Sequence, residues 1–150
     1  MNTSITVGQM LRAKGYGYHA IAPDATAYSA LQLMAEKNIG ALMVMENDKL
    51  VGVFSERDYA RKVILKGKSS KSTTVREIMT SSPISIKPSM TLWESMVLMS
   101  QNHIRHLPIM DNDVLLGVLS NRDVVNKLIS DYESTIEKLE NYITGAEYTA

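Results

Sequence analysis

The sequence contains no cysteine among its 150 residues. This absence excludes disulfide bonds, thiolate metal ligands and cysteine nucleophiles. No apolar run approaches the roughly 20 residues that a membrane-spanning helix needs, and the N-terminus lacks the charged-then-apolar order of a secretory signal. We therefore predict a cytoplasmic protein with no membrane segment.

The chain also lacks an excess of charge of either sign, because it has 16 Lys and Arg against 16 Asp and Glu. A strongly basic surface that would attract nucleic acid or an anionic membrane is therefore not expected. The three histidines, His19, His103 and His106, form no pair at the i, i+4 spacing of helical zinc motifs. No metal site is predicted.

The chain repeats itself with an offset of 65 residues, since residues 21–58 align with residues 86–123 without a gap. The best-preserved pattern is Gly-Val-x-Ser-x-Arg-Asp, at 52–58 and 117–123. Two copies are too few for a solenoid, so they indicate a closed pair.

Each copy predicts the same order of elements. A short extended segment precedes a helix that begins at Thr26 or Thr91, and two short apolar runs with an Asn/Asp turn between them predict a β-hairpin. Ser55 and Ser120 then stand at the start of a second helix as favoured N-caps. The predicted fold class is α+β, with two β-α-β-β-α repeats paired about a pseudo-two-fold axis.

The predicted boundaries are 7–66 for the first repeat, 67–74 for a polar linker, 75–130 for the second repeat and 131–145 for an extended C-terminal helix. From the end of the second repeat through this helix, apolar residues follow alternating spacings of four and three: Val125, Ile129, Tyr132, Ile136, Leu139 and Ile143. Such a heptad pattern fits either a helix that packs on its own domain or a contact with a second chain.

The end of each copy combines groups that suit a nucleotide. Helix N-termini attract anions, Arg forms paired hydrogen bonds with phosphate, and ionised Asp accepts hydrogen bonds from sugar hydroxyls. However, Ser-x-x-Asp is also a self-contained helix cap, so both interpretations stay open. The residues concerned are Ser55, Arg57 and Asp58 in the first copy, and Ser120, Arg122 and Asp123 in the second.

These elements resemble, in their order, the tandem cystathionine-β-synthase (CBS) domain family, also called Bateman modules. The resemblance covers about residues 7–130 and includes His-Ile-Arg-His-Leu-Pro-Ile at 103–109. It implies ligand clefts between the repeats, commonly for AMP, ADP or ATP and in some members for NAD(H) or S-adenosylmethionine. It further implies a homodimer that needs no cofactor, binds AMP in preference and regulates a partner protein that the sequence does not identify.

The resemblance also assigns roles to particular positions. The ribose-binding acid falls on Asp58 and Asp123, and the neighbouring hydroxyl on Ser55 and Ser120. Backbone contacts to the adenine fall on His19 and Ile21 or on Ile84 and Ile86, and apolar contacts to the base fall on Met43 and Val53 or on Pro108 and Val118. Phosphate contacts fall on Arg105 and His106, with Lys14, Arg57, Arg61 and Lys62 as further candidates, and Arg122 repeats Arg57.

The two copies differ at one informative place, because Gly40-Ala41 in the first replaces Arg105-His106 in the second. The two clefts are therefore not expected to be equivalent. A competing hypothesis is a structural or protein-interaction module with degenerate ligand sites. An enzyme is not expected, since the sequence contains no Gly-x-Ser-x-Gly, His-Glu-x-x-His, P-loop or Gly-x-Gly-x-x-Gly motif.

Overall fold

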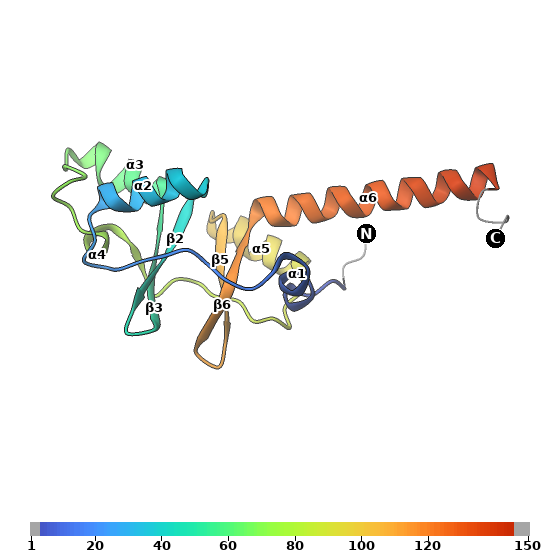
Figure 1. Ribbon diagram of the computed structural model, residues 1–150, viewed down its shortest axis with the longest axis horizontal. Coiled ribbons are helices and arrows are strands. Elements are labelled where there is room, and N and C mark those ends of the chain that lie inside the picture. Colours follow the sequence, from blue (N-terminus) through green and yellow to red (C-terminus); the bar gives the residue numbers. More distant parts are fainter. Residues whose placement is uncertain (1–3, 146–150) are drawn as a thin grey trace.

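A computed structural model describes residues 4–145 as two lobes that lie side by side, with a long helix that projects from the second (Figure 1). The first lobe contains β1 (Ala20–Ile21), α2 (Ala27–Lys37), β2 (Ala41–Glu46), β3 (Lys49–Ser55), α3 (Glu56–Lys62) and the 3-10 turn η1 (Ile64–Lys66). The second contains α5 (Leu92–Asn102), β5 (His106–Asp111), β6 (Val114–Ser120) and α6 (Asn121–Thr144). Three short elements complete the chain: α1 (Val7–Lys14), α4 (Val75–Ile78) and β4 (Thr80–Ser81). The predicted fold class is confirmed.

Local sequence determines the hairpins and helix starts. The hairpin loops Asn47-Asp48 and Asn112-Asp113 have φ between 47° and 64°, as a two-residue type I′ turn requires. Ser55 and Ser120 each cap a helix, and the Asp three residues later completes a capping box by accepting from the Ser N–H. These predicted hairpins and caps are confirmed.

Each lobe is built on a hairpin. In the first lobe the strand order is β1-β2-β3-β4, in which β1 is parallel to β2 and the other pairs are antiparallel. In the second lobe β5 and β6 form the hairpin, and single bridges join Ile86 to Ile109 and Gly17 to Gly117. The second lobe therefore repeats the hairpin and its parallel neighbour, but its other edge pairs in parallel at Gly17 where β4 is antiparallel to β3.

The packed units differ from the sequence repeats, because each lobe takes a segment from the other half of the chain. Val7 and Leu11 of α1 are buried in the core of the second lobe. Val75 and Ile78 of α4 are buried with Phe54 in the core of the first. The boundaries 7–66 and 75–130 thus describe repeats of sequence, whereas each hydrophobic core contains residues from both.

Two glycines permit this exchange of segments. A Cβ atom on Gly52 would lie 2.6 Å from Met79 Sδ and 2.9 Å from the Thr80 carbonyl oxygen. A Cβ atom on Gly117 would lie 2.8 Å from Leu11 Cδ1. The repeated Gly-Val therefore leaves room for the segment that crosses over from the other half.

The C-terminal helix is one 24-residue element that continues directly from the second repeat, so the predicted helix over 131–145 begins earlier, at Asn121. Val124 is buried, and Leu128 packs against the second core. Beyond these residues α6 extends away from the lobes (Figure 1). Within residues 4–145, no helix is both long and apolar enough to cross a membrane.

Candidate functional site: an inter-lobe cavity

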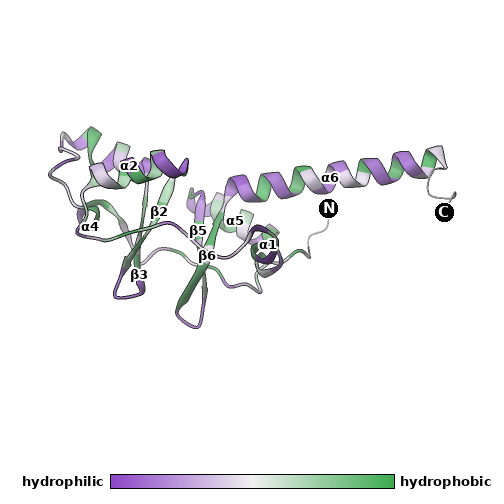
Figure 2. Ribbon diagram, in the orientation of Figure 1, coloured by the Kyte–Doolittle hydropathy of each residue, from purple (hydrophilic) through white to green (hydrophobic). Residues whose placement is uncertain are grey.

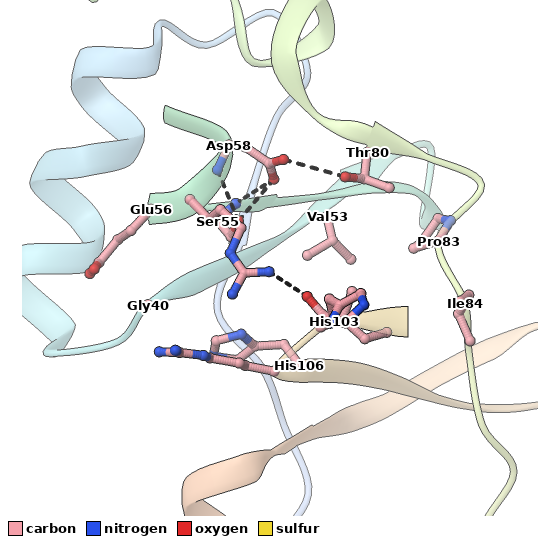
Figure 3. Close-up of a pocket in the computed structure, with 13 residues that line it drawn as sticks. Gly40, Val53, Ser55, Glu56, Asp58, Thr80, Pro83, Ile84, His103 and His106 are labelled. Atoms are coloured by element: carbon pink, nitrogen blue, oxygen red, sulfur yellow. Dashed lines mark hydrogen bonds between the residues drawn. The ribbon is translucent and has the colours of Figure 1, made fainter. Parts of the chain in front are cut away.

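A cavity of about 330 Å³ lies between the lobes (Figure 3). Seven of the predicted site residues line it: Ser55, Arg57 and Asp58 at the start of α3, Arg105 and His106 at the start of β5, and Val53 and Ile84, which were assigned to the base. The other lining residues are Gly40, Glu56, Thr80, Pro83, His103 and Ile104. The structure therefore brings the end of the first repeat against the His-Ile-Arg-His stretch of the second.

Asp58 is both a capping residue and a wall of this cavity. Its Oδ2 accepts hydrogen bonds of 3.0 Å from the Ser55 N–H and hydroxyl. Its Oδ1 lies 3.1 Å from Lys62 Nζ and 3.5 Å from Thr80 Oγ1. The cap uses mainly Oδ2, and a ligand hydroxyl that binds Oδ1 would replace the long contact of this oxygen with Thr80.

Arg57 connects the two lobes, because its guanidinium donates a hydrogen bond to the carbonyl oxygen of His103. His103 is the C-cap of α5, with a left-handed φ of 53°. A cation is favourable at this position, since helix C-termini carry partial negative charge. A guanidinium has five N–H donors, and this contact uses one of them.

His106 packs across the interface against Gly40. A Cβ atom on Gly40 would lie 3.6 Å from Cε1 of His106, an ordinary van der Waals distance, so an alanine would also fit beside the ring. Burial lowers the pKa of His106 below its ordinary value of 6.5; the positive charges of Arg105 and Lys14 lower it further, and Asp123 opposes them. His106 is therefore mainly neutral near pH 7.

The corresponding acid of the second copy has different surroundings. Lys14 Nζ lies 2.7 Å from Asp123 Oδ2 and donates a second hydrogen bond of 3.1 Å to the Val118 carbonyl. Asp123 Oδ2 also accepts from the Ser120 N–H at 2.9 Å. Burial raises the pKa of Asp123, but the bonds from Lys14 and Ser120 outweigh it and leave this pKa below its usual value. Lys14, a predicted phosphate contact, here pairs with an acid.

The other predicted contacts lie away from the cavity. The His19 carbonyl accepts from the Met43 N–H, and Ile21 packs against the first core. Ile86 and Pro108 are buried and joined by a backbone hydrogen bond of 2.9 Å. Arg122 is exposed in the first turn of α6.

Sequence reasoning missed Glu56, Thr80, Pro83 and His103 as lining residues. Thr80 pairs with Val53 because β4 crosses to the first lobe, and Pro83 follows on the same segment. The clue in the sequence was the duplication itself, since a closed pair requires segments of the two halves to meet. Among the described residues, no cluster of His, Asp and Glu could hold a metal ion.

The fold and the cavity define a duplicated α+β module whose two lobes share one pocket lined by apolar and charged side chains. A family model described as "CBS domain" matches residues 16–64 and 75–130. The chain belongs to the CBS domain family.

Known relatives agree with this assignment over most of the chain. CBS domain-containing protein CBSX3, mitochondrial, of Arabidopsis thaliana is 35% identical over 151 residues, which cover 95% of this chain and 73% of the relative. A CBS-domain protein of Burkholderia ambifaria, provisionally described as a signal-transduction protein, has 43% identity and a TM-score of 0.81, covering 84% and 95%. The CBS domain protein NE2398 has 42% identity and a TM-score of 0.79, covering 83% and 97%. CBS domain pairs generally serve as regulatory modules.

Proposed function

We propose that this chain is a non-catalytic regulatory module that binds one adenine nucleotide, preferentially AMP, in the inter-lobe cavity. The observation that carries the proposal is the order of side chains along this cavity. Pro83 and Ile84 lie on one side of Val53, and Glu56 and Gly40 lie on the other (Figure 3). Glu56 thus lies apart from the apolar Pro83 and Ile84, while Thr80 and His103 lie near them (Figure 3).

This order matches the parts of a nucleotide. The side chains of Val53, Pro83 and Ile84 offer an apolar surface for a base. The Asp58 carboxylate, 14% exposed at the cavity wall, can accept from ribose hydroxyls. Arg57 and Arg105 provide charged donors for a phosphate.

Size and charge favour a nucleoside monophosphate. A volume of about 330 Å³ lies near the lower end of the 300–1,000 Å³ typical of small-molecule pockets, which disfavours a dinucleotide such as NAD(H). Glu56 and Asp58 balance the charges of Arg57 and Arg105 in this lining. A nearly neutral pocket suits one phosphate better than the three of ATP.

The proposed mechanism is a population shift. Because residues of both lobes line the cavity, a ligand that contacts both stabilises one relative orientation of the lobes. That orientation alters the surface offered to a regulated protein. We include in this proposal that the module is a homodimer, which the exposed apolar side chains of Trp93 and Val97 on α5 support.

A second candidate function is a structural or protein-interaction module without a ligand. The two complete capping boxes favour it, because Asp58 and Asp123 each have a role in helix capping that needs no nucleotide.

The cytoplasmic location also stays a prediction, and the Arabidopsis relative is mitochondrial by its description.

Calorimetric titration with AMP, ADP, ATP and NADH tests the proposal. We expect one AMP per chain and about 10- to 100-fold weaker binding by Asp58→Asn, which removes one charged hydrogen-bond acceptor but keeps the capping oxygen. The matched control is Asp123→Asn, which makes the same change in the corresponding capping box of the second repeat but leaves the cavity intact. Absence of heat with every nucleotide would favour the interaction module, and turnover of a nucleotide would favour an enzyme.

A further inference from the structure

One face of α6 is apolar and exposed beyond the second lobe. Ile129, Ile136 and Leu139 are 51%, 55% and 56% exposed, and Ile143 is 81% exposed. Apolar and polar residues alternate along the projecting helix (Figure 2). The lobes themselves therefore do not cover this face.

Burial in the second core supports the start of α6, where Val124 is buried and Leu128 packs against that core. In proteins most of the stability of a helix comes from packing of its apolar face. The ion pair between Lys127 and Asp131, at 2.8 Å, supports one turn near the lobe. A 24-residue helix whose apolar face stays in water gains little from packing, so a partner surface would stabilise it.

The spacing of the apolar residues specifies what kind of partner fits. Ile129, Ile136 and Ile143 occupy the a positions of a heptad. The d positions, each four residues before the next a position, are Val125, Tyr132 and Leu139. Ile at a with Leu at d favours two parallel strands; the three a positions and Leu139 follow this pattern, and Val125 and Tyr132 depart from it. The seam therefore matches a second copy of itself.

Charges beside the seam select the direction of the pair. Glu133 and Glu140 occupy the e positions, whereas Leu128, Thr135 and Tyr142 occupy the g positions. In an antiparallel pair, e positions face e positions, so glutamates would lie against glutamates. In a parallel pair, each glutamate lies opposite an uncharged g residue, and this repulsion is avoided.

We infer that α6 forms a parallel two-stranded coiled coil with α6 of a second copy of this chain. This inference rests on the homodimer in the proposed function and adds α6 to the α5 surface proposed there. Both lobes of each copy then lie at the same end of the coil.

Sedimentation equilibrium of the full chain tests the seam. Ile136→Asp places a charge at an a position, and we expect it to weaken dimerisation by at least about 30-fold. Ser134→Asp introduces the same side chain on the opposite face of the helix and should leave the dimer intact. A monomeric wild type, or a dimer that Ile136→Asp leaves unchanged, would overturn the inference.

Cysteine cross-linking tests the direction, since the native chain contains no cysteine. We expect Ile129→Cys and Leu139→Cys each to form a disulfide dimer under mild oxidation, because equivalent residues face one another in a parallel coil. These positions are about 15 Å apart along a helix, so an antiparallel pair brings at most one of them against itself. If either single-cysteine variant remains dimeric but does not cross-link, the seam is not parallel.

AMP titration of Ile136→Asp separates this inference from the proposed function. Ile136 lies outside both hydrophobic cores and outside the cavity, so a folded monomer that still binds AMP shows loss of the seam alone. Retained dimerisation without AMP binding in the wild type would contradict the nucleotide site and leave the coiled coil intact.

Discussion

The ion pair between Lys14 and Asp123 joins the second acid of the duplicated motif to a residue far along the chain, whereas Asp58 pairs with Lys62 in its own helix. Lys14 Nζ lies 2.7 Å from the carboxylate, and its side chain is 45% exposed while that of Asp123 is 19% exposed. In Lys14→Met the aliphatic part of the side chain remains but the charge is lost. Asp123 then keeps its bond from Ser120 and loses its cationic partner.

The expected cost follows from the exposure of the pair. Solvent-exposed ion pairs contribute about 0.2–1 kcal/mol. The hydrogen bond to the Val118 carbonyl is lost as well, so we expect Lys14→Met to destabilise the fold by about 0.5–1.5 kcal/mol. For a chain of this size that corresponds to a fall in Tm of about 1–6 °C.

A double-mutant cycle isolates the pair. Urea unfolding of Lys14→Met, Asp123→Asn and the double variant should give a coupling free energy of about 0.5–1 kcal/mol. Because Lys14 and Asp123 lie outside the cavity, Lys14→Met should bind one AMP, as the wild type does. A coupling free energy within about 0.3 kcal/mol of zero would refute the reasoning.

Two further predictions follow from the lobe interface. Gly52→Ala should destabilise the protein by about 1–3 kcal/mol in urea unfolding, because the new Cβ meets the Thr80 backbone; Gly117→Ala should cost less, since Leu11 can move its side chain. His106 has a pKa below 6.5 because it is buried, so between that pKa and 6.5 the unfolded chain binds more protons than the folded chain. Stability should therefore fall as pH decreases from about 6.5, and His106→Gln should flatten this dependence in thermal melts recorded from pH 7 to 5. If Tm changes equally with pH in the wild type and in His106→Gln, the assignment of this dependence to His106 is wrong.

Local patterns were sufficient to predict the hairpins, the helix caps and the duplication. The Asn-Asp loops and the Ser-x-x-Asp caps depend on residues within three positions of each other, so a single sequence contains the necessary information. The exchange of α1 and α4 depends on distant contacts; for example, the Val7 N–H donates a hydrogen bond of 2.7 Å to the Met90 carbonyl oxygen. No local periodicity specifies such a distant partner.

The candidate site also combines features that local sequence predicts with features that depend on distant residues. Asp58 and Asp123 have nearly the same neighbours in sequence, and both complete a capping box as predicted. Their difference comes from residues far along the chain, Thr80 at the first and Lys14 at the second. The motif therefore predicted which residues matter locally but not which of the two acids lines the cavity.

The crossing of α1 and α4 between the lobes has a consequence for how this molecule comes apart. Since each hydrophobic core includes a helix contributed by the opposite half, neither lobe can lose its packing without exposing apolar surface that the other half supplied. The two halves consequently melt as one cooperative unit. A fragment cut at the polar stretch before Val75 would retain one hairpin but be missing part of the core that covers it.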